Sequence, residues 1–242
     1  MRATNPMRAT NWEFTNRALV FGLIFGFAFS VYVIDPQNST AALANWLGAR
    51  LHIIDADLAA RLLFVLATGL LIVAALTRTW ASSYLNATVV YAAEVKTATL
   101  VADGPYRRVR NPLYFANVLL ALGLGAMMSR TGFLVAIILM LVFCYRLIFR
   151  EESELQAGQG EQYDRYRDAV PRLWPALGPR IASAGREGRW KDGFKAEFWC
   201  WGCALAVAAF AITLNLPAFF AILAASIAIL WVFSRISEKQ PR

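Results

Sequence analysis

A cationic, turn-forming stretch provides side chains that could bind a charged ligand. Residues 103–114 read Asp-Gly-Pro-Tyr-Arg-Arg-Val-Arg-Asn-Pro-Leu-Tyr and lead directly into an apolar run. Gly104 permits a close approach of the backbone to a ligand, and the N–H groups of such a turn can point at acceptors. Arg110 and Asn111 add a cation and an amide. The stretch is suited to holding a small charged molecule, although an ordinary turn and helix cap would use the same residue types.

A second charged group stands at the polar end of the next apolar run, where the sequence reads Arg150-Glu151-Glu152. Two carboxylates near a helix C-terminus are disfavoured by the helix dipole and need cations close by. Arg146 and Arg150 could supply them, and so could a cationic ligand. A solvated helix end is the alternative, because Glu154 continues the acidic run.

Polar residues also enter the first of these two apolar runs. Asn111, Tyr114 and Asn117 recur at intervals of three and share one helical face. Such a stripe at the mouth of a membrane helix is unfavourable unless it faces protein or ligand. Capping and snorkelling explain Asn111 and Arg108, but they explain Tyr114 and Asn117 less well.

The elements that must position these residues are apolar helices. The chain of 242 residues is 58% hydrophobic, only 17% charged, and has a mean hydropathy of +0.47, which indicates a membrane protein. Each of six apolar runs has close to the roughly 17–25 residues that span a bilayer. They are 18–34, 58–76, 113–128, 132–149, 198–216 and 217–233. We predict an all-α, polytopic membrane protein with about six transmembrane helices.

Loop lengths and charge predict the topology. Only Ser129, Arg130 and Thr131 separate the third and fourth runs, so these must form an antiparallel hairpin. The fifth and sixth runs meet near Pro217 and form either a second hairpin or one kinked helix. Of 24 Lys and Arg residues, only three fall on one predicted side, namely Arg50, Arg61 and Arg130. The positive-inside rule therefore places both termini and both large loops in the cytoplasm of a multi-pass protein, with the bacterial inner membrane as the predicted location.

Several function classes are disfavoured. The net charge of +8 fits cytoplasmic loops that face anionic lipid headgroups, so we expect no nucleic-acid partner. His52 is the only histidine and lies on the predicted external side, so histidine-based catalysis or metal binding at the cytoplasmic face is disfavoured. Cys200 and Cys203 lie one helical turn apart without a second pair, so we expect core packing and no metal. Gly123-Leu124-Gly125 is more typical of close helix packing than of a nucleotide loop.

The motifs together resemble the isoprenylcysteine carboxyl methyltransferase and phospholipid methyltransferase superfamily. The family pattern is Leu-Val-x-x-Gly-Pro-Tyr-Arg-x-Val-Arg-His/Asn-Pro-x-Tyr, an apolar hairpin, Glu-Glu-x-x-Leu, Gly-x-x-Tyr-x-x-Tyr and Val-Pro-x-x-x-Pro. The corresponding residues here are 100–114, 151–155, 160–166 and 170–175, in the family's order. The match covers about a third of the chain. One departure is Asn111, where the isoprenylcysteine branch has a titratable His.

The resemblance implies an S-adenosylmethionine-dependent methyltransferase with a cytosolic cofactor site and no Rossmann fold. The implied cofactor-binding residues are Leu100, Val101, Gly104, Pro105, Tyr106, Arg110, Asn111, Tyr114, Glu151 and Glu152. Glu151 and Glu152 would meet the cationic methionine end of the cofactor. The expected catalytic residues are Glu152, Tyr114 and Arg150, with Glu152 or Tyr114 as the base if the acceptor is an amine.

The expected organisation is a single membrane domain, 1–242. It divides into a two-span region (1–95), a methyltransferase core (96–176), and a basic loop with a C-terminal hairpin (177–242). The expected partners are membrane lipids and a lipid-like or small apolar methyl acceptor. A sterol-type NADPH-dependent reductase and a non-enzymatic membrane protein are the alternatives. The reductase should carry a Cys-x-x-Lys-Tyr-Gly stretch, where this chain has Gly160-Glu161-Gln162-Tyr163.

Overall fold

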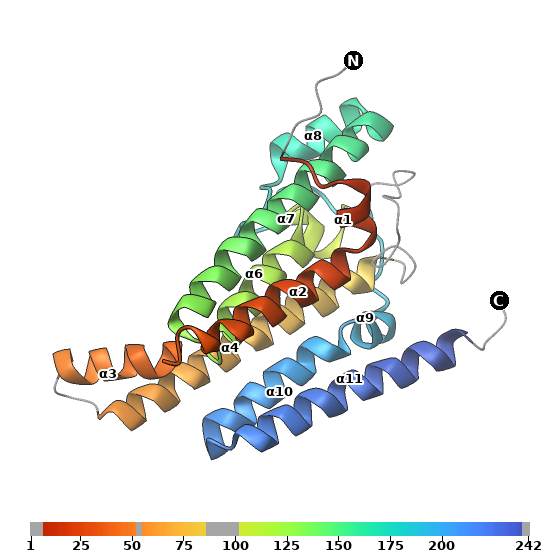
Figure 1. Cartoon of the computed structure of the whole chain (residues 1–242). Helices are drawn as coiled ribbons and strands as arrows, with labels where there is room; N and C mark the ends of the chain where they lie inside the picture. Colours follow the sequence, from red (N-terminus) through yellow and green to blue (C-terminus); the bar gives the residue numbers. More distant parts are fainter. Residues whose placement is uncertain (1–6, 52–54, 86–101, 239–242) are drawn as a thin grey trace.

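The computed structural model describes residues 7–51, 55–85 and 102–238 of the chain. This described part is helical, with an isolated β-bridge between Asn38 and Ser129. The elements in chain order are α1 (Asn11–Thr15), α2 (Arg17–Ser30), η1 (Val31–Val33), α3 (Ser39–Leu51), α4 (Ala56–Tyr84), η2 (Gly104–Arg107), α6 (Pro112–Gly125), α7 (Arg130–Gln159), α8 (Glu161–Ala169), α9 (Trp190–Ala196), α10 (Phe198–Thr213) and α11 (Leu216–Glu238). Figure 1 shows long helices side by side, with short helices at their ends.

All six predicted apolar runs form helices, namely α2, α4, α6, α7, α10 and α11. The fourth run begins where Ser129 caps α7 by accepting a hydrogen bond from the Gly132 N–H, at 3.0 Å. The predicted hairpin of α6 and α7 is confirmed. The second hairpin is also confirmed, because Leu214 takes a left-handed conformation (φ 51°) and reverses the chain between α10 and α11.

The count of six transmembrane helices is not confirmed. By length and composition, α4 and α7 can each cross a membrane, and α9 with α10 would form a third span bent by 62°. The other apolar helical segments are shorter: Arg17–Val33, α6, and Leu216–Ile229 within α11. The 14 residues of α6 extend only about 21 Å, against a hydrocarbon core of about 30 Å.

Helix α3 is an element that the sequence interpretation does not anticipate. Two hydroxyl groups in its first turn donate to carbonyl groups at the C-terminal end of α6. Ser39 Oγ donates to the Gly125 carbonyl at 2.8 Å, and Thr40 Oγ1 donates to the Ala126 carbonyl at 2.9 Å. These contacts close the end of the bundle where α6 turns into α7.

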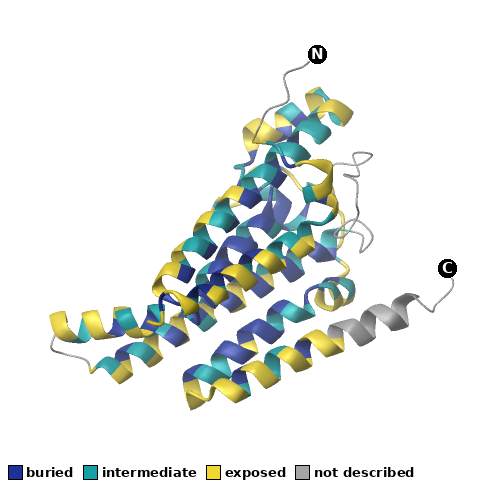
Figure 2. Cartoon of the chain, viewed as in Figure 1, coloured by how far each residue is buried: buried dark blue, intermediate teal, exposed yellow. Residues whose placement is uncertain are grey.

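Helix α6 lies at the centre of the bundle, and most of its residues are buried. In Figure 2 the buried residues concentrate on α6 and on the sides of α4 and α7 that face it. A Cβ added to Gly123 would lie 2.5 Å from the Leu71 side chain of α4, and one added to Gly125 would lie 2.1 Å from the Phe133 ring of α7. The two glycines therefore serve close helix packing, as the sequence indicated.

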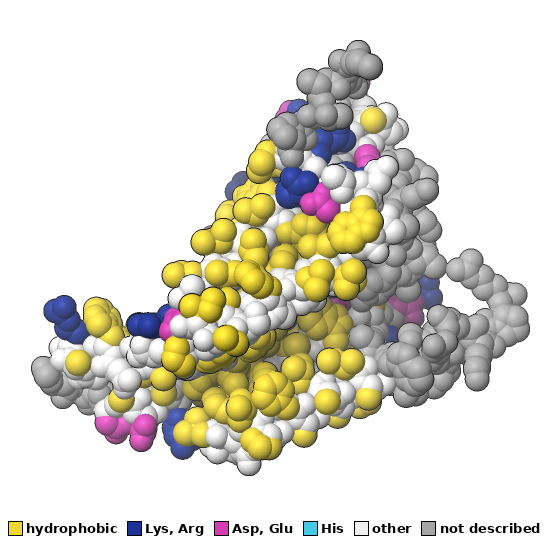
Figure 3. Space-filling view, in the orientation of Figure 1, with side chains coloured by type: hydrophobic (Ala, Val, Ile, Leu, Met, Phe, Trp, Pro, Cys, Tyr) yellow, Lys and Arg dark blue, Asp and Glu magenta, His cyan; other side chains and the backbone are white. Residues whose placement is uncertain are grey.

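The polar elements lie at the two ends of the bundle. Helices α1, η2, α8 and α9 gather at one end, and the turns that follow α2, α6 and α10 lie at the other (Figure 1). Figure 3 shows hydrophobic side chains along the middle of the visible face, with charged side chains mainly towards the ends. This arrangement is that of a membrane protein, and the cytoplasmic assignment of the α8 end stays a prediction.

We predict that Gly132→Ala destabilises the bundle by about 1–3 kcal/mol through overpacking. The new Cβ would lie 2.3 Å from the Ala28 carbonyl oxygen, so the backbone of α2 or α7 must move. Thermal unfolding in detergent measures the change. The matched control is Gly69→Ala in α4, whose Cβ would meet nothing within 4 Å. An unchanged melting temperature for Gly132→Ala would contradict the packing of α2 on α7.

Candidate functional site

The structure brings together the two charged stretches that the sequence singled out. The Tyr114 hydroxyl of α6 donates to Glu151 Oε1 of α7 at 2.6 Å. Arg110 Nη1, just before α6, donates to Glu152 Oε1 at 2.7 Å. Tyr114, Arg110 and Glu152 are largely buried, and Glu151 is partly exposed. The stretch that contains Arg110 and Tyr114 and the stretch that contains Glu151 and Glu152 thus form two halves of one polar site.

The environment of Glu151 and Glu152 differs from the one predicted. We expected them near a helix C-terminus, but α7 continues to Gln159 and ends at Gly160, which has φ 53°. The unfavourable dipole effect is limited to the last turn, so it does not act on these carboxylates. Their partners are therefore set by tertiary contacts with the loop before α6.

Glu152 is held between two arginines. In addition to Arg110, the Arg172 guanidinium lies 3.0 Å from Glu152 Oε2 and donates from Nε to both carboxylate oxygens. The Arg110 side chain also donates to the Val170 carbonyl at 2.9 Å. Sequence reasoning missed Arg172, although it lies inside the Val-Pro-x-x-x-Pro motif, because a motif does not say which variable position faces inward.

Asp103 fastens the loop to the segment that follows α8. Its buried carboxylate accepts hydrogen bonds from Ser183 Oγ at 2.7 Å, the Ala184 N–H at 3.0 Å and the Arg186 N–H at 3.1 Å. Burial alone would raise the pKa of Asp103, but these hydrogen bonds lower it below its usual value. Residues 183–186 are thereby held across the start of η2. We call these three hydrogen bonds the Asp103 clasp.

Gly104 adopts the turn conformation that the sequence indicated, with φ 58°. A Cβ at this position would lie 2.5 Å from the ring of Tyr84 at the end of α4. The glycine is thus required both by its backbone angle and by its packing. Pro105 and Tyr106 follow it and are buried in η2.

Helix α8 covers this turn. The Tyr166 hydroxyl donates to the Tyr106 carbonyl at 2.8 Å, and both Tyr163 and Tyr166 are buried. Tyr163, Tyr166 and Arg167 share one helical face at spacings of three and four, which predicts that the three lie over the site together. The two tyrosines do so, whereas Arg167 remains more exposed and pairs with Asp164 at 2.9 Å.

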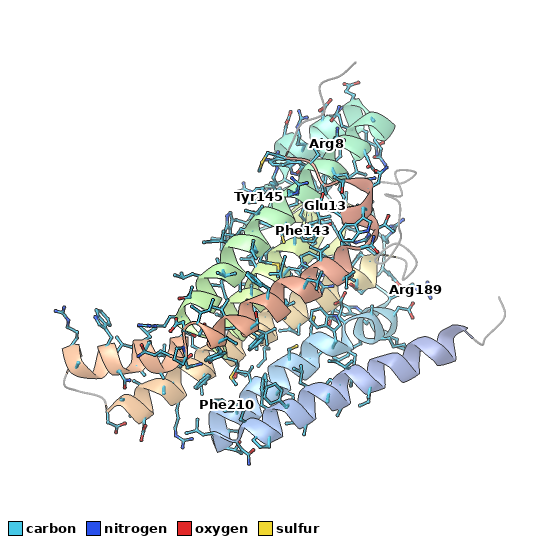
Figure 4. All side chains as sticks on the ribbon, in the orientation of Figure 1. Arg8, Glu13, Phe143, Tyr145, Arg189 and Phe210 are labelled. Atoms are coloured by element: carbon cyan, nitrogen blue, oxygen red, sulfur yellow. The ribbon has the colours of Figure 1, made fainter. Side chains whose placement is uncertain are left out.

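The N-terminal segment packs on the end of α7. Phe14 is buried between the guanidinium groups of Arg17 and Arg150, at 4.6 and 4.8 Å from its ring centroid. Arg146 pairs with Glu13 at 2.8 Å. Figure 4 labels Glu13 on α1 beside α7.

Arg150 contacts its own helix and the N-terminal segment, and its expected catalytic role stays a prediction. It pairs with Glu154 at 2.8 Å and donates to Asn11 Oδ1 at 2.7 Å. Neither contact joins it to the Tyr114–Glu151 or Arg110–Glu152 pairs. The contacts of Arg150 with Asn11 and with the Phe14 ring hold the N-terminal segment against α7.

The predicted polar stripe of α6 has three different partners. Asn111 donates to the Arg172 carbonyl at 2.9 Å, Tyr114 reaches α7, and Asn117 accepts from Arg78 of α4 at 2.6 Å. Arg78 also pairs with the buried Glu197. Sequence reasoning missed Arg78 and Glu197. Each of the two residues stands next to an apolar run, which could have marked it as a buried charge. We instead assigned Arg78 to a cytoplasmic loop under the positive-inside rule.

Two implied cofactor residues, Leu100 and Val101, lie outside the described residues, and so does His52. No group of three or more His, Cys, Asp or Glu side chains that could hold a metal ion occurs among the residues that the structure describes. The three cysteines are buried and unpaired by disulfides, as core packing requires.

Comparison with known proteins identifies a family for one segment of the chain. Residues 62–161 match the family model described as phospholipid methyltransferase. This match confirms the predicted superfamily for a segment that runs from α4 to the start of α8 and contains both halves of the site. The segment is that of a membrane methyltransferase family. It ends before Arg172, residues 183–186 of the Asp103 clasp and Glu197.

Two curated relatives match over 100 residues. One is the cobalt-zinc-cadmium resistance protein CzcN of Cupriavidus metallidurans, with 31% identity over 41% of this chain and 43% of the relative. The other is the nickel-cobalt-cadmium resistance protein NccN of Alcaligenes xylosoxydans xylosoxydans, with 29% identity over 41% of this chain and 44% of the relative. The chain spans less than half the length of these relatives. No solved structure matches.

We predict that the Glu13–Arg146 pair stabilises the N-terminal segment in a pH-dependent way. The hydrogen bond from Arg146 is the main reason why the pKa of Glu13 falls from 4.5 to about 2. A lowered folded-state pKa means that the stabilisation is present above pH 4.5 and is lost as the pH falls to about 2. Hydrogen exchange of residues 10–16 in the native protein and in Glu13→Gln measures this. The difference between the two proteins should vanish near pH 2, and a constant difference would contradict it.

We also predict that Asp103→Asn loosens residues 183–186, because a neutral amide accepts the three hydrogen bonds less strongly. Trypsin cleavage after Arg186 should become about tenfold faster, since the local opening free energy falls by about 1.4 kcal/mol. Asp168→Asn on exposed α8 is the control. Equal cleavage of the two variants would exclude the Asp103 clasp.

Proposed function

We propose that the chain is an S-adenosylmethionine-dependent membrane methyltransferase that acts on a lipid-like or small apolar acceptor reached from the bilayer. The observation that carries the proposal is the direct contact between the two halves of the site, Tyr114 with Glu151 and Arg110 with Glu152. Family membership of the segment that contains them supports the reaction class.

The donor set fits the charges of the proposed cofactor, which has a sulfonium, an ammonium, a carboxylate and ribose hydroxyls. Glu151 can meet a cation, because only Oε1 accepts from Tyr114 and the side chain is partly exposed. Glu152 is less suited, because both its oxygens already accept from Arg172. The bound cofactor would supply an electrophilic methyl group.

The residues of the site would align reactants and exclude water, which is most of what methyl transfer requires. Tyr163 and Tyr166 cover the turn at η2, and the Asp103 clasp keeps the following segment over it. A carboxylate or thiolate acceptor would need no strong base. For an amine acceptor, the Tyr114–Glu151 hydrogen bond offers a path for a proton from the hydroxyl oxygen to the carboxylate.

The two relatives are named as metal-resistance proteins. The described residues of this chain offer no metal cluster, so the names add no metal-binding function to the proposal. A reductase remains the second enzyme class to be tested, and a non-enzymatic membrane protein predicts that neither cofactor binds.

Calorimetry of the purified protein with S-adenosylmethionine and, separately, with NADPH tests the class of cofactor. We expect binding of the first and none of the second, because the site offers the partly exposed carboxylate of Glu151 to a cationic cofactor. A protein that keeps its helical circular dichroism and melting transition but does not bind S-adenosylmethionine would overturn the proposal. If S-adenosylmethionine binds, lipid analysis of an overexpressing strain narrows the class of methyl acceptor.

The two carboxylates should differ in their effects. Glu151→Gln removes the charge offered to the cofactor, so we expect a loss of about tenfold or more in affinity, or at least 1.4 kcal/mol. Glu152→Gln weakens the contacts with Arg110 and Arg172 and should lower the melting temperature more than the affinity. Glu187→Gln on the exposed loop is the control. Unchanged affinity in both variants would remove the carboxylates from the cofactor site.

A further inference from the structure

Arg78, Asn117 and Glu197 form a buried charge cluster together with Ser82. Arg78 donates from Nε to Glu197 Oε2, and from Nη2 to Glu197 Oε1 at 3.2 Å. Ser82 Oγ donates to Glu197 Oε1 at 2.6 Å, and Arg78 Nη1 donates to Asn117 Oδ1 at 2.6 Å. The relative exposures are 0% for Glu197 and 7% for Arg78.

The cluster joins three parts of the chain that are distant in sequence. Arg78 and Ser82 belong to α4 and Asn117 belongs to α6, whereas Glu197 lies at the 62° break between α9 and α10. The break lets this side chain point into the bundle. Gly193 permits the approach, because a Cβ there would lie 2.5 Å from the Thr79 carbonyl oxygen.

An ion pair buried in this way is unfavourable unless both partners are well hydrogen-bonded. Here the bidentate guanidinium–carboxylate pair, the serine hydroxyl and the asparagine oxygen meet that condition. Charges inside a membrane bundle are commonly functional. A pair of apolar residues would hold the helices together with less desolvation, so the directional bonds point to a need for alignment.

Asn117 lies one turn after Tyr114 on α6. The two residues are three positions apart and point to neighbouring sides of the helix, so Tyr114 meets α7 while Asn117 meets α4. Two polar contacts on different sides fix the rotation of α6 about its axis. The contact with Arg78 therefore controls how the Tyr114 hydroxyl meets Glu151.

Tyr106 connects the cluster with the site from the other direction. Burial raises the pKa of Tyr106 well above its usual value, and the charges that act on it include Glu151, Glu197 and Arg78. The charges of the ion pair and of Glu151 therefore both act on this buried tyrosine.

We propose that Glu197 is a positioning residue that holds Arg78 against Asn117 and so aligns Tyr114 with Glu151, which makes the C-terminal hairpin part of the cofactor-binding unit. This inference rests on the proposed function. It adds to the site a residue that lies beyond the family segment 62–161.

The test is a double-mutant cycle with S-adenosylmethionine affinity, measured by calorimetry on the full chain, as its readout. Glu197→Gln keeps the shape of the side chain and removes its charge. We expect it to weaken binding about tenfold, and Tyr114→Phe to weaken binding as well. The double variant should bind within about twofold of Tyr114→Phe alone, because coupled residues are not additive. Additive losses, or native affinity in Glu197→Gln, would overturn the inference.

Phe219→Leu separates positioning from simple stability. Phe219 is buried in the C-terminal hairpin against Phe210, which Figure 4 labels, and it takes no part in the cluster. We expect Phe219→Leu to lower the melting temperature and leave affinity within about twofold of native. Equal losses of affinity in Phe219→Leu and Glu197→Gln would mean that the cluster acts only through stability.

Asn117→Ala serves if Glu197→Gln does not fold, because it leaves the ion pair intact and removes only its link to α6. It should show the same absence of additivity with Tyr114→Phe. Failure of the native chain to bind S-adenosylmethionine would instead refute the proposed function, so the two failures are distinguishable.

Discussion

The polar first turns of α6 can lie buried between α4 and α7 because each polar side chain finds a partner on a different element. Asn111 meets the segment after α8, Tyr114 meets α7, and Asn117 meets Arg78 of α4. In an apolar surrounding, an unpaired polar group is strongly unfavourable. This requirement fixes where α6 sits and which way it faces, and the site is built around its first turns.

The same requirement explains why the site is assembled from distant segments. A helix end supplies only a few groups, and the loop before α6 supplies cations that need carboxylates. The α6–α7 hairpin returns the chain to the same end of the bundle, so that Arg110 meets Glu152. Residues 170–186 then cross over the loop and are held by Arg110 and Asp103. The result is an enclosed polar region at one end of an otherwise apolar bundle.

Much of the fold was predictable from local pattern. The apolar runs predicted six helices, and the short link at Ser129 predicted the hairpin of α6 and α7. Helix α3 was missed because its stability comes from contacts with the end of α6. The extension of α7 to Gln159 was missed because hydropathy marks where an apolar run ends, and a helix can continue as a polar one beyond it.

The sequence by itself determined the helical class, the order of the helices, the turn at Gly104 and the two charged stretches that meet at the proposed site. These features depend on composition, periodicity and backbone freedom, which neighbouring residues specify. The tertiary structure alone decided the pairings: Tyr114 with Glu151, Glu152 between two arginines, Arg150 with the N-terminal segment, and Glu197 with Arg78. A buried charge takes the partner that packing brings within reach, and that distance is not encoded in any local stretch of sequence.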